Sequence, residues 1–189
     1  MTVFLLGLLI FLGVHSISIV NEPWRDRMVK AIGKWPWKGL YSLVAAFGFV
    51  RIIWGYGLSS SDSFDLYVPP LWLHRLALLV LLPVFVLFLA AYFPGRIKKA
   101  TGHPMLLATC LWAAGHLLAN GSLVNVILFG SFLAWAIVDR ISVQYRQPRQ
   151  IPGAPPSRFN DLIVLVLGLG LYIIFVFWLH QLLIGVPPF

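Results

Sequence analysis

Residues His103 to Val138 read HPMLLATCLWAAGHLLANGSLVNVILFGSFLAWAIV, a stretch of 36 residues without a formally charged side chain. A polar side chain in bilayer hydrocarbon costs free energy unless it has a partner, so the histidines and asparagines of this stretch are candidate site residues. The sequence Asn120-Gly121-Ser122 is a turn signal, which divides the stretch into two short antiparallel helices. The first of these helices carries His116, the first residue to consider for function.

Composition extends this interpretation to the whole chain. Hydrophobic residues make up 60% of the sequence and charged residues 11%, and the mean hydropathy is +0.88. A soluble globule of this composition would leave too much apolar surface in water, so we predict an integral membrane protein. A helix needs about 20 apolar residues to cross a hydrocarbon core about 30 Å thick.

We therefore expect an all-α, polytopic protein that forms one domain over residues 1–189, a bundle of six transmembrane helices. The expected spans are Val3 to Val20, Trp37 to Gly57, Leu71 to Phe93, His103 to Asn120, Leu123 to Val138 and Asp161 to Ile184. The first segment has neither a basic region before it nor a small-residue cleavage site after it, so it is taken as a span and not as a signal peptide.

Charge in the loops predicts the orientation. Of the 14 basic residues, 12 lie in the first, third and fifth loops. By the positive-inside rule these loops are cytoplasmic, and both termini are then periplasmic. The formal net charge of +8 is divided among three short loops beside membrane spans and does not form one basic stripe. A nucleic-acid partner is therefore not expected.

Local signals add detail to this topology. Pro23 and the following WRDRMVKAIG predict a short interfacial helix with apolar and basic faces. Pro83 predicts a kink in the third span because proline removes a helical donor. The stretch QPRQIPGAPPSR, residues 147–158, is expected to be a cytoplasmic loop. Gly168 and Gly170 lie within the last span, where close helix packing is the expected reason for them.

Several kinds of chemistry are disfavoured by the residues present. The single cysteine, Cys110, excludes an intrachain disulfide, a CxxC redox pair and covalent haem attachment through CxxCH. All six acidic residues fall at span ends or in loops, which does not support hydrolytic acid–base catalysis. There is no glycine-rich loop that would hold a phosphate. Intramembrane histidines are the chemically versatile groups that remain.

Imidazole is the usual protein ligand of a b-type haem, and membrane helices can hold a porphyrin between them. On the fourth span, helical spacing places Thr109, Trp112, Ala113, His116 and Asn120 along one face. This face is polar enough to be expected to point inward. We predict that His116 is an axial ligand and that Trp112 and Asn120 contact the cofactor.

The first span carries a second candidate ligand. There His15 shares a partly polar face with Phe11, Ser18 and Glu22 on an otherwise apolar helix. His15 is therefore the expected counterpart of His116, so that one haem b is held by two histidines.

Depth leaves the choice of the second ligand open. The first span runs inward and the fourth outward, which offsets His15 from His116 by about 10 Å at 1.5 Å per residue. His74 and His180 match the depth of His116 better, although each has an interfacial position as its alternative explanation. His103 precedes a proline at a helix start, and it lies on nearly the opposite helical face from His116, so a second haem on this helix is not expected.

Two arginines lie within the outer parts of predicted spans. Arg51 belongs to the second span and Arg75 to the start of the third. A charge at such depth is costly unless it is paired or reaches the interface. Arginine offers a planar fork to a carboxylate, so either residue is a candidate partner for a haem propionate, with snorkelling as the alternative.

Three long runs resemble the NnrU family of bacterial membrane proteins, and the similarity covers most of the chain. They are TGHPMLLATCLWAAGHLLANGSLVNVILFGSFLAWAIVD, WKGLYSLVAAFGFVRIIWGYG and AAYFPGRIKKATGHP. The resemblance implies a multi-pass protein of the bacterial inner membrane that is associated with denitrification, in connection with nitrite and nitric-oxide reduction.

The sequence is also similar to the plant and cyanobacterial 15-cis-zeta-carotene isomerases. In those membrane enzymes a haem b held by histidines performs a redox-gated double-bond isomerisation. The resemblance places the axial histidines on His15 and on His116 of the LWAAGH motif. The isomerases have a cysteine three residues before the second histidine. That position is Ala113 here, and Cys110 lies on a different face, which counts against ligand switching.

One main function and two alternatives to it are therefore expected, with enzymatic activity left open. The first is a haem-b protein of nitrogen-oxide metabolism that handles or senses nitric oxide or passes electrons. The second is a redox-gated cis–trans isomerase acting on a hydrophobic polyene. The third is a haem-free assembly factor that binds subunits of a respiratory reductase, its histidines making only interhelical hydrogen bonds. In each case the surrounding partner is the lipid bilayer.

Overall fold

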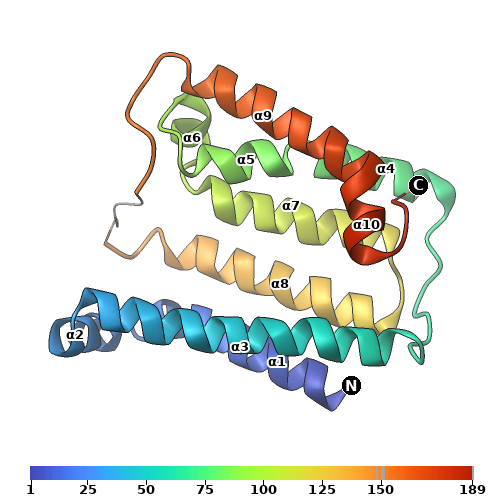
Figure 1. The fold of residues 1–189 in the computed structure, drawn as a ribbon, viewed down its shortest axis with the longest axis horizontal. Coiled ribbons are helices and arrows are strands. Elements are labelled where there is room, and N and C mark those ends of the chain that lie inside the picture. The colour runs from blue at the N-terminus through green and yellow to red at the C-terminus, as the bar shows by residue number, and fades with distance from the viewer. Residues whose placement is uncertain (148, 150–151, 189) are drawn as a thin grey trace. The chain divides into compact units, whose positions relative to one another are not determined.

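The computed structural model describes residues 1–147, 149 and 152–188, and its long elements are all helices (Figure 1). The chain divides into two compact units. Unit 1 comprises Met1–Tyr67 and Ser122–Gln147, and unit 2 comprises Val68–Gly121 and Pro148–Phe189. Each unit therefore combines segments that are distant in sequence.

Among the described residues, five helical segments are long and apolar enough to cross a membrane. They are Thr2–Val20, Lys34–Ser60, Leu71–Ala90, Leu123–Ser142 and Asn160–Ile184. The sixth expected span is a shorter apolar helix, Pro104–Ala119, of 16 residues. Its rise of about 24 Å at 1.5 Å per residue is less than the roughly 30 Å of the hydrocarbon core. The all-helical membrane fold is confirmed, whereas the sixth crossing and the orientation of the termini stay predictions.

Unit 1 is built on a close pair of antiparallel helices, α1 (Thr2–Val20) and α3 (Lys34–Ser60). Glycines bring the two backbones together. A Cβ on Gly7 would lie 2.6 Å from the Ile52 nitrogen, and one on Gly48 would lie 2.8 Å from the Phe11 nitrogen. In lipid, where burial adds little, such close approach provides the packing contacts between helices.

Helix α8 (Leu123–Ser142) completes unit 1. It contributes Val124 to a core with Phe4, Leu8 and Ile52. The loop after α3 satisfies the start of α8, because the Leu123 N–H donates to the Phe64 carbonyl at 2.9 Å. The predicted turn at residues 120–122 is confirmed, since the preceding helix ends at Ala119.

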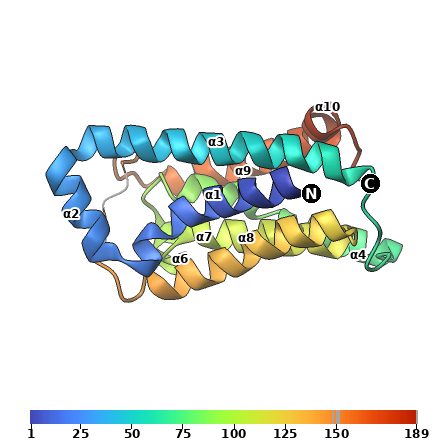
Figure 2. The ribbon, with the colours of Figure 1, turned by 90° about the horizontal axis from the view of Figure 1, so that it is seen from below.

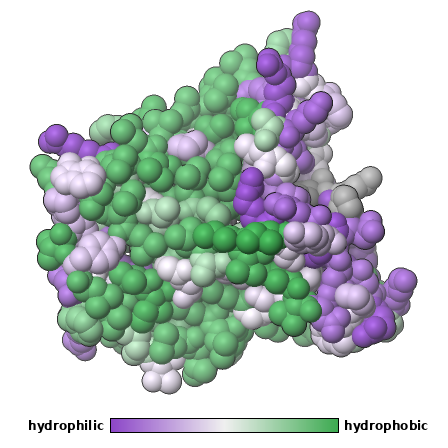
Figure 3. Space-filling view, turned by 180° about the vertical axis from the view of Figure 1, so that it is seen from behind, coloured by the Kyte–Doolittle hydropathy of each residue, from purple (hydrophilic) through white to green (hydrophobic). Residues whose placement is uncertain are grey.

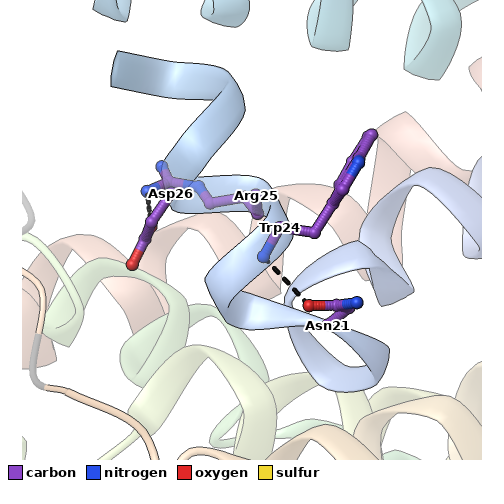
Figure 4. A network of polar contacts seen from close by, with 4 residues as sticks. All are labelled: Asn21, Trp24, Arg25 and Asp26. Carbon is purple, nitrogen blue, oxygen red and sulfur yellow. Dashed lines mark hydrogen bonds and ion pairs between the residues drawn. The ribbon is translucent and has the colours of Figure 1, made fainter. Parts of the chain in front are cut away.

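Helix α2 (Glu22–Ile32) connects α1 to α3 across their shared end (Figure 2). Its first turn is capped by Asn21, whose side-chain oxygen accepts from the Trp24 N–H at 2.9 Å (Figure 4). The helix predicted after Pro23 is thereby confirmed; its place at the membrane surface stays a prediction.

Unit 2 contains two helices that together form one apolar segment. They are α4 (Leu71–Leu81) and α5 (Val84–Ala90), and Pro83 separates them, which confirms the predicted break. The carbonyl of Leu78, just before the break, accepts from the Tyr172 hydroxyl at 2.8 Å. This carbonyl already accepts from the Leu82 N–H at 3.1 Å, so the tyrosine adds a second hydrogen bond that links two helices of unit 2 just before the break.

The remaining helices of unit 2 are α6 (Arg96–Thr101), α7 (Pro104–Ala119), α9 (Asn160–Ile174), the π-helix η1 (Phe175–Leu179) and α10 (His180–Ile184). Helices α6, α7 and α9 pack against the kinked segment, and α10 packs against η1. Gly115 of α7 lies against Leu81, and Gly168 of α9 lies against Val86. Close packing is confirmed for Gly168, while a Cβ on Gly170 would meet nothing within 4 Å.

Hydrogen bonds of two polar side chains stabilise one end of unit 2. The Asp161 carboxylate accepts from the backbone N–H groups of Arg96 and Ile97 at 2.9 and 3.1 Å, which caps the start of α6. The buried Asn160 amide donates to the Pro94 and Pro155 carbonyls. Asp161 is therefore explained by helix capping.

The loop predicted at residues 147–158 falls partly outside the described residues, which omit 148, 150 and 151. Residues 152–157 have no regular structure, in agreement with the prediction. Apolar side chains cover the surface over the long helices, and hydrophilic side chains gather near the helix ends (Figure 3). This distribution is the one expected for helices that contact lipid.

Candidate functional site

The predicted site residues are distributed over both units. Unit 1 contains His15 and Arg51. Unit 2 contains the other candidates, namely His74, Arg75, Trp112, His116, Asn120 and His180. Each group is described within its own unit.

His116 is oriented by its own helix. Its Nδ1 lies 2.9 Å from the Trp112 carbonyl oxygen one turn earlier in α7. The centroids of the Trp112 and His116 rings are 5.3 Å apart. The Asn120 amide in turn donates to the His116 carbonyl at 3.0 Å. Trp112, His116 and Asn120 thus follow one another at four-residue spacing, on the face where the sequence predicted them, and Ala113 beside them is fully buried.

The bond to Trp112 determines how the imidazole is protonated. A carbonyl oxygen can only accept, so Nδ1 of His116 carries the proton. In the neutral ring Nε2 is then the nitrogen with the lone pair. An Nδ1–H bond to a main-chain carbonyl is the usual outer-shell arrangement that orients a metal-ligating histidine.

A second histidine of unit 2 follows an irregular helical turn. The last apolar segment changes from α-helix to the π-helix η1 immediately before His180. Such turns are rare and often occur at functional sites. Nδ1 of His180 lies 2.7 Å from the Val186 carbonyl oxygen, so this ring too has its lone pair on Nε2. The His180 ring meets the Phe175 ring of η1 edge to face at 5.9 Å.

The other candidates of unit 2 are less constrained. Nδ1 of His74 is 3.4 Å from the Pro70 carbonyl, a long contact, and Arg75 beside it is exposed. His103 stands at the N-cap position of α7 with Pro104 after it, as the sequence predicted. Among the described histidines of this unit, His116 and His180 are thus the two with a short anchoring bond.

In unit 1, aromatic rings from three helices surround His15. Its Nδ1 lies 2.7 Å from the Phe11 carbonyl oxygen. The centroids of the Phe11 and His15 rings are 4.3 Å apart, with an angle of 33° between the ring planes. Tyr41 of α3 and Trp135 of α8 meet it edge to face at 5.3 and 5.9 Å. The anchoring bond again leaves the lone pair on Nε2. Packing of α1, α3 and α8 thus defines the position of this imidazole.

Four buried side-chain polar atoms of unit 1 have no hydrogen-bond partner among the described residues, and Nε of Arg146 and Oγ of Ser59 are two of these. The two that bear on the predicted site are Nε1 of Trp135, the tryptophan beside His15, and Nε of Arg51. The Arg51 guanidinium lies over the Phe47 ring at 4.7 Å. Buried donors without acceptors are uncommon in folded proteins. A ligand that brings acceptor oxygens would satisfy them, and the two carboxylates of haem b fit this requirement.

Sequence reasoning missed two residues around His15. Tyr41 and Trp135 belong to other helices, and periodicity within one helix does not reveal contacts between helices. It also missed the mostly buried ion pair between Asp139, near the end of α8, and Arg146, which follows that helix.

Within the part of the chain that the structure describes, no three His, Cys, Asp or Glu side chains gather into a metal-holding group. A haem iron takes four ligands from its porphyrin and needs only axial ligands from the protein. Single anchored histidines are therefore the relevant feature.

A family model described as NnrU protein matches residues 3–188. Because the match covers nearly the whole chain and both units, the protein belongs to the NnrU family. No curated protein and no solved structure matches the sequence.

Proposed function

We propose that this member of the NnrU family is a haem-b protein of the bacterial inner membrane that serves nitrite and nitric-oxide reduction. One observation carries the haem proposal. Histidines on apolar helices have Nδ1 bonded to main-chain carbonyls, at 2.9 Å for His116 and 2.7 Å for His15, so that Nε2 has the lone pair that a ligand needs.

In this proposal His116 is one axial ligand. Resemblance assigns the other to His15, whose imidazole has the same anchoring bond. His180, which belongs to the same unit as His116, is the competing second ligand and is supported by its short anchor. His74, with its longer contact, is the weaker alternative.

The surrounding residues have definable roles toward such a cofactor. Trp112 would contact the haem beside His116, and Asn120 would hold the end of α7 through its bond to the His116 carbonyl. Nε of Arg51 and Nε1 of Trp135 would donate to propionate oxygens. Arg75, exposed on α4, remains a second candidate for a propionate. Bound haem would supply one-electron chemistry and an iron that binds nitric oxide.

The haem proposal is tested by the visible spectrum of the detergent-purified protein, oxidised and then reduced. We expect a Soret band with sharp reduced α and β bands in the wild type and their loss in His116→Ala. His15→Ala and His180→Ala distinguish the two candidate second ligands, and the one that is not a ligand should leave the bands unchanged. His103→Ala, at the N-cap of the same helix, is the matched control.

A colourless wild type that stays colourless after haem is added back would overturn the haem proposal. Copurification of respiratory reductase subunits with such a protein would instead favour an assembly factor. Conversion of a cis polyene by the reduced protein alone would favour the isomerase. The physiological role is tested separately, since deletion of the gene should impair growth on nitrite and the reduction of nitric oxide.

A further inference from the structure

Unit 1 has an apolar groove that borders the surroundings of His15, since Tyr41 belongs to both. It has a volume of about 470 Å³ and lies between α1, α2 and α3. Gly13, Trp24, Trp37, Tyr41 and Val44 are among its lining residues. A volume of this size is within the range of small-molecule sites, roughly 300 to 1,000 Å³.

The floor of the groove is open at Gly13. A Cβ at this position would meet no atom within 4 Å, in contrast to Gly7 and Gly48, which are needed for contact between α1 and α3. The missing side chain of Gly13 therefore leaves room on the outer side of the helix pair, where lipid is the surrounding solvent.

Two indole rings stand where the groove reaches α2. Trp24 and Trp37 meet edge to face at 6.0 Å. Trp24 points away from the side of α2 that carries the Arg25–Asp26 ion pair (Figure 4). Tryptophan is enriched at the level of lipid headgroups because its ring is apolar and its N–H is polar. This end of the groove therefore has the character of a membrane interface.

The same end of unit 1 is positively charged. Residues 21–38 contain five basic and two acidic side chains, and Asp26 pairs with Arg25 at 2.8 Å. Arg27 follows Trp24 by three residues, and Lys34 precedes Trp37 by three residues. Each is therefore about one turn from a groove tryptophan and on its side of the helix. Both side chains are exposed.

We propose that this groove binds an acyl chain of an anionic phospholipid, whose phosphate is held by Arg27 and Lys34. The apolar lining excludes a polar occupant from the groove, and the basic mouth selects a negative headgroup over a zwitterionic one. Lys30 belongs to α2, as Arg27 does, but its position six residues after Trp24 places it on another face of that helix from the tryptophan.

Native mass spectrometry tests this proposal. The purified protein is incubated with mixed micelles of equal amounts of phosphatidylglycerol and phosphatidylcholine that have identical acyl chains. We expect one phosphatidylglycerol to be retained in preference to phosphatidylcholine. Gly13→Phe should lower retention about tenfold, the loss expected when about two methylene groups lose contact. Gly57→Phe is the matched control, because Gly57 is also an exposed helical glycine whose Cβ would meet nothing.

A second pair of variants tests the headgroup contact. The double variant Arg27→Gln with Lys34→Gln should lower the preference for phosphatidylglycerol about tenfold, whereas Lys30→Gln should leave it unchanged. Helix content and gel filtration establish that each variant is folded, and Gly13→Leu replaces Gly13→Phe if the larger side chain prevents folding. Equal retention of the two lipids, or wild-type retention in the filled groove, would overturn the proposal.

Discussion

The imidazoles of His15 and His116 are held in different ways. The His116 imidazole is anchored within α7 by the Trp112 carbonyl, and the His116 carbonyl accepts from Asn120 one turn later. His15 has a similar anchor to Phe11, but Tyr41 and Trp135 from two other helices fix its surroundings. We expect an imidazole anchored within one helix to tolerate changes in packing better than one whose surroundings come from three helices.

The largest difference in stability between the two regions is expected from overpacking the contact between α1 and α3. Gly48→Val would push a side chain against the Phe11 main chain, and the Phe11 carbonyl is the acceptor for His15. Because backbone cannot move as a rotamer can, we expect a loss of about 1–3 kcal/mol in unfolding free energy. Unfolding by SDS in mixed detergent micelles measures this loss of unfolding free energy.

Gly57→Val is the control for that experiment, since it has the same change in helix propensity and no neighbour within 4 Å. Haem spectra of the Gly48 variant sharpen the comparison further. If His15 is a ligand, the bands should shift; unchanged bands together with lost stability would assign the second axial position to another histidine.

Overpacking next to His116 should have a smaller effect. A Cβ on Gly115 would meet the side chain of Leu81, which can change rotamer. Gly115→Ala is therefore expected to cost about 1 kcal/mol or less, and to leave the haem bands in place because the anchor of His116 lies within its own helix. The same unfolding assay applies, and a loss as large as that of Gly48→Val would contradict the proposed difference between the two sites.

The sequence predicted what lies within one helix and missed what lies between helices. Hydropathy located the apolar segments, and proline and turn residues marked the breaks at Pro83 and at residues 120–122, because these signals are local. The polar face around His116 was predicted for the same reason. The rings around His15 come from distant parts of the chain, so helical spacing contained no information on them. The sixth span was predicted from hydropathy, but the helix has only 16 residues.

Removing an unpaired donor near His15 should separate stability from cofactor binding. Nε1 of Trp135 is buried without a partner among the described residues, so Trp135→Phe removes a polar group whose burial is uncompensated. Stability without haem should therefore change by less than about 1 kcal/mol or increase slightly. If the indole donates to a propionate, haem occupancy should fall in the same variant, as judged by the Soret absorbance per protein.

Arg51→Leu provides an independent test of the same idea, because Nε of Arg51 is another buried donor of unit 1 without a partner among the described residues. Arg75→Leu is its comparison in unit 2, where the side chain is exposed. Normal haem occupancy in both Arg51→Leu and Trp135→Phe would remove the proposed propionate contacts while leaving the axial ligands untouched.

The smallest predicted difference in unfolding free energy concerns two tyrosines, each of which links two helices by a hydrogen bond. Tyr56 donates to the Asn125 side chain in unit 1 at 2.7 Å, and Tyr172 donates to the Leu78 carbonyl in unit 2. Tyr56→Phe leaves the Asn125 oxygen without this donor and should cost about 1 kcal/mol. The Leu78 carbonyl still accepts from the Leu82 N–H at 3.1 Å. Tyr172→Phe should therefore cost only about 0.5 kcal/mol, close to the average for such bonds in membranes, and an inverted order in the unfolding assay would show that the kink at Pro83 depends on the tyrosine.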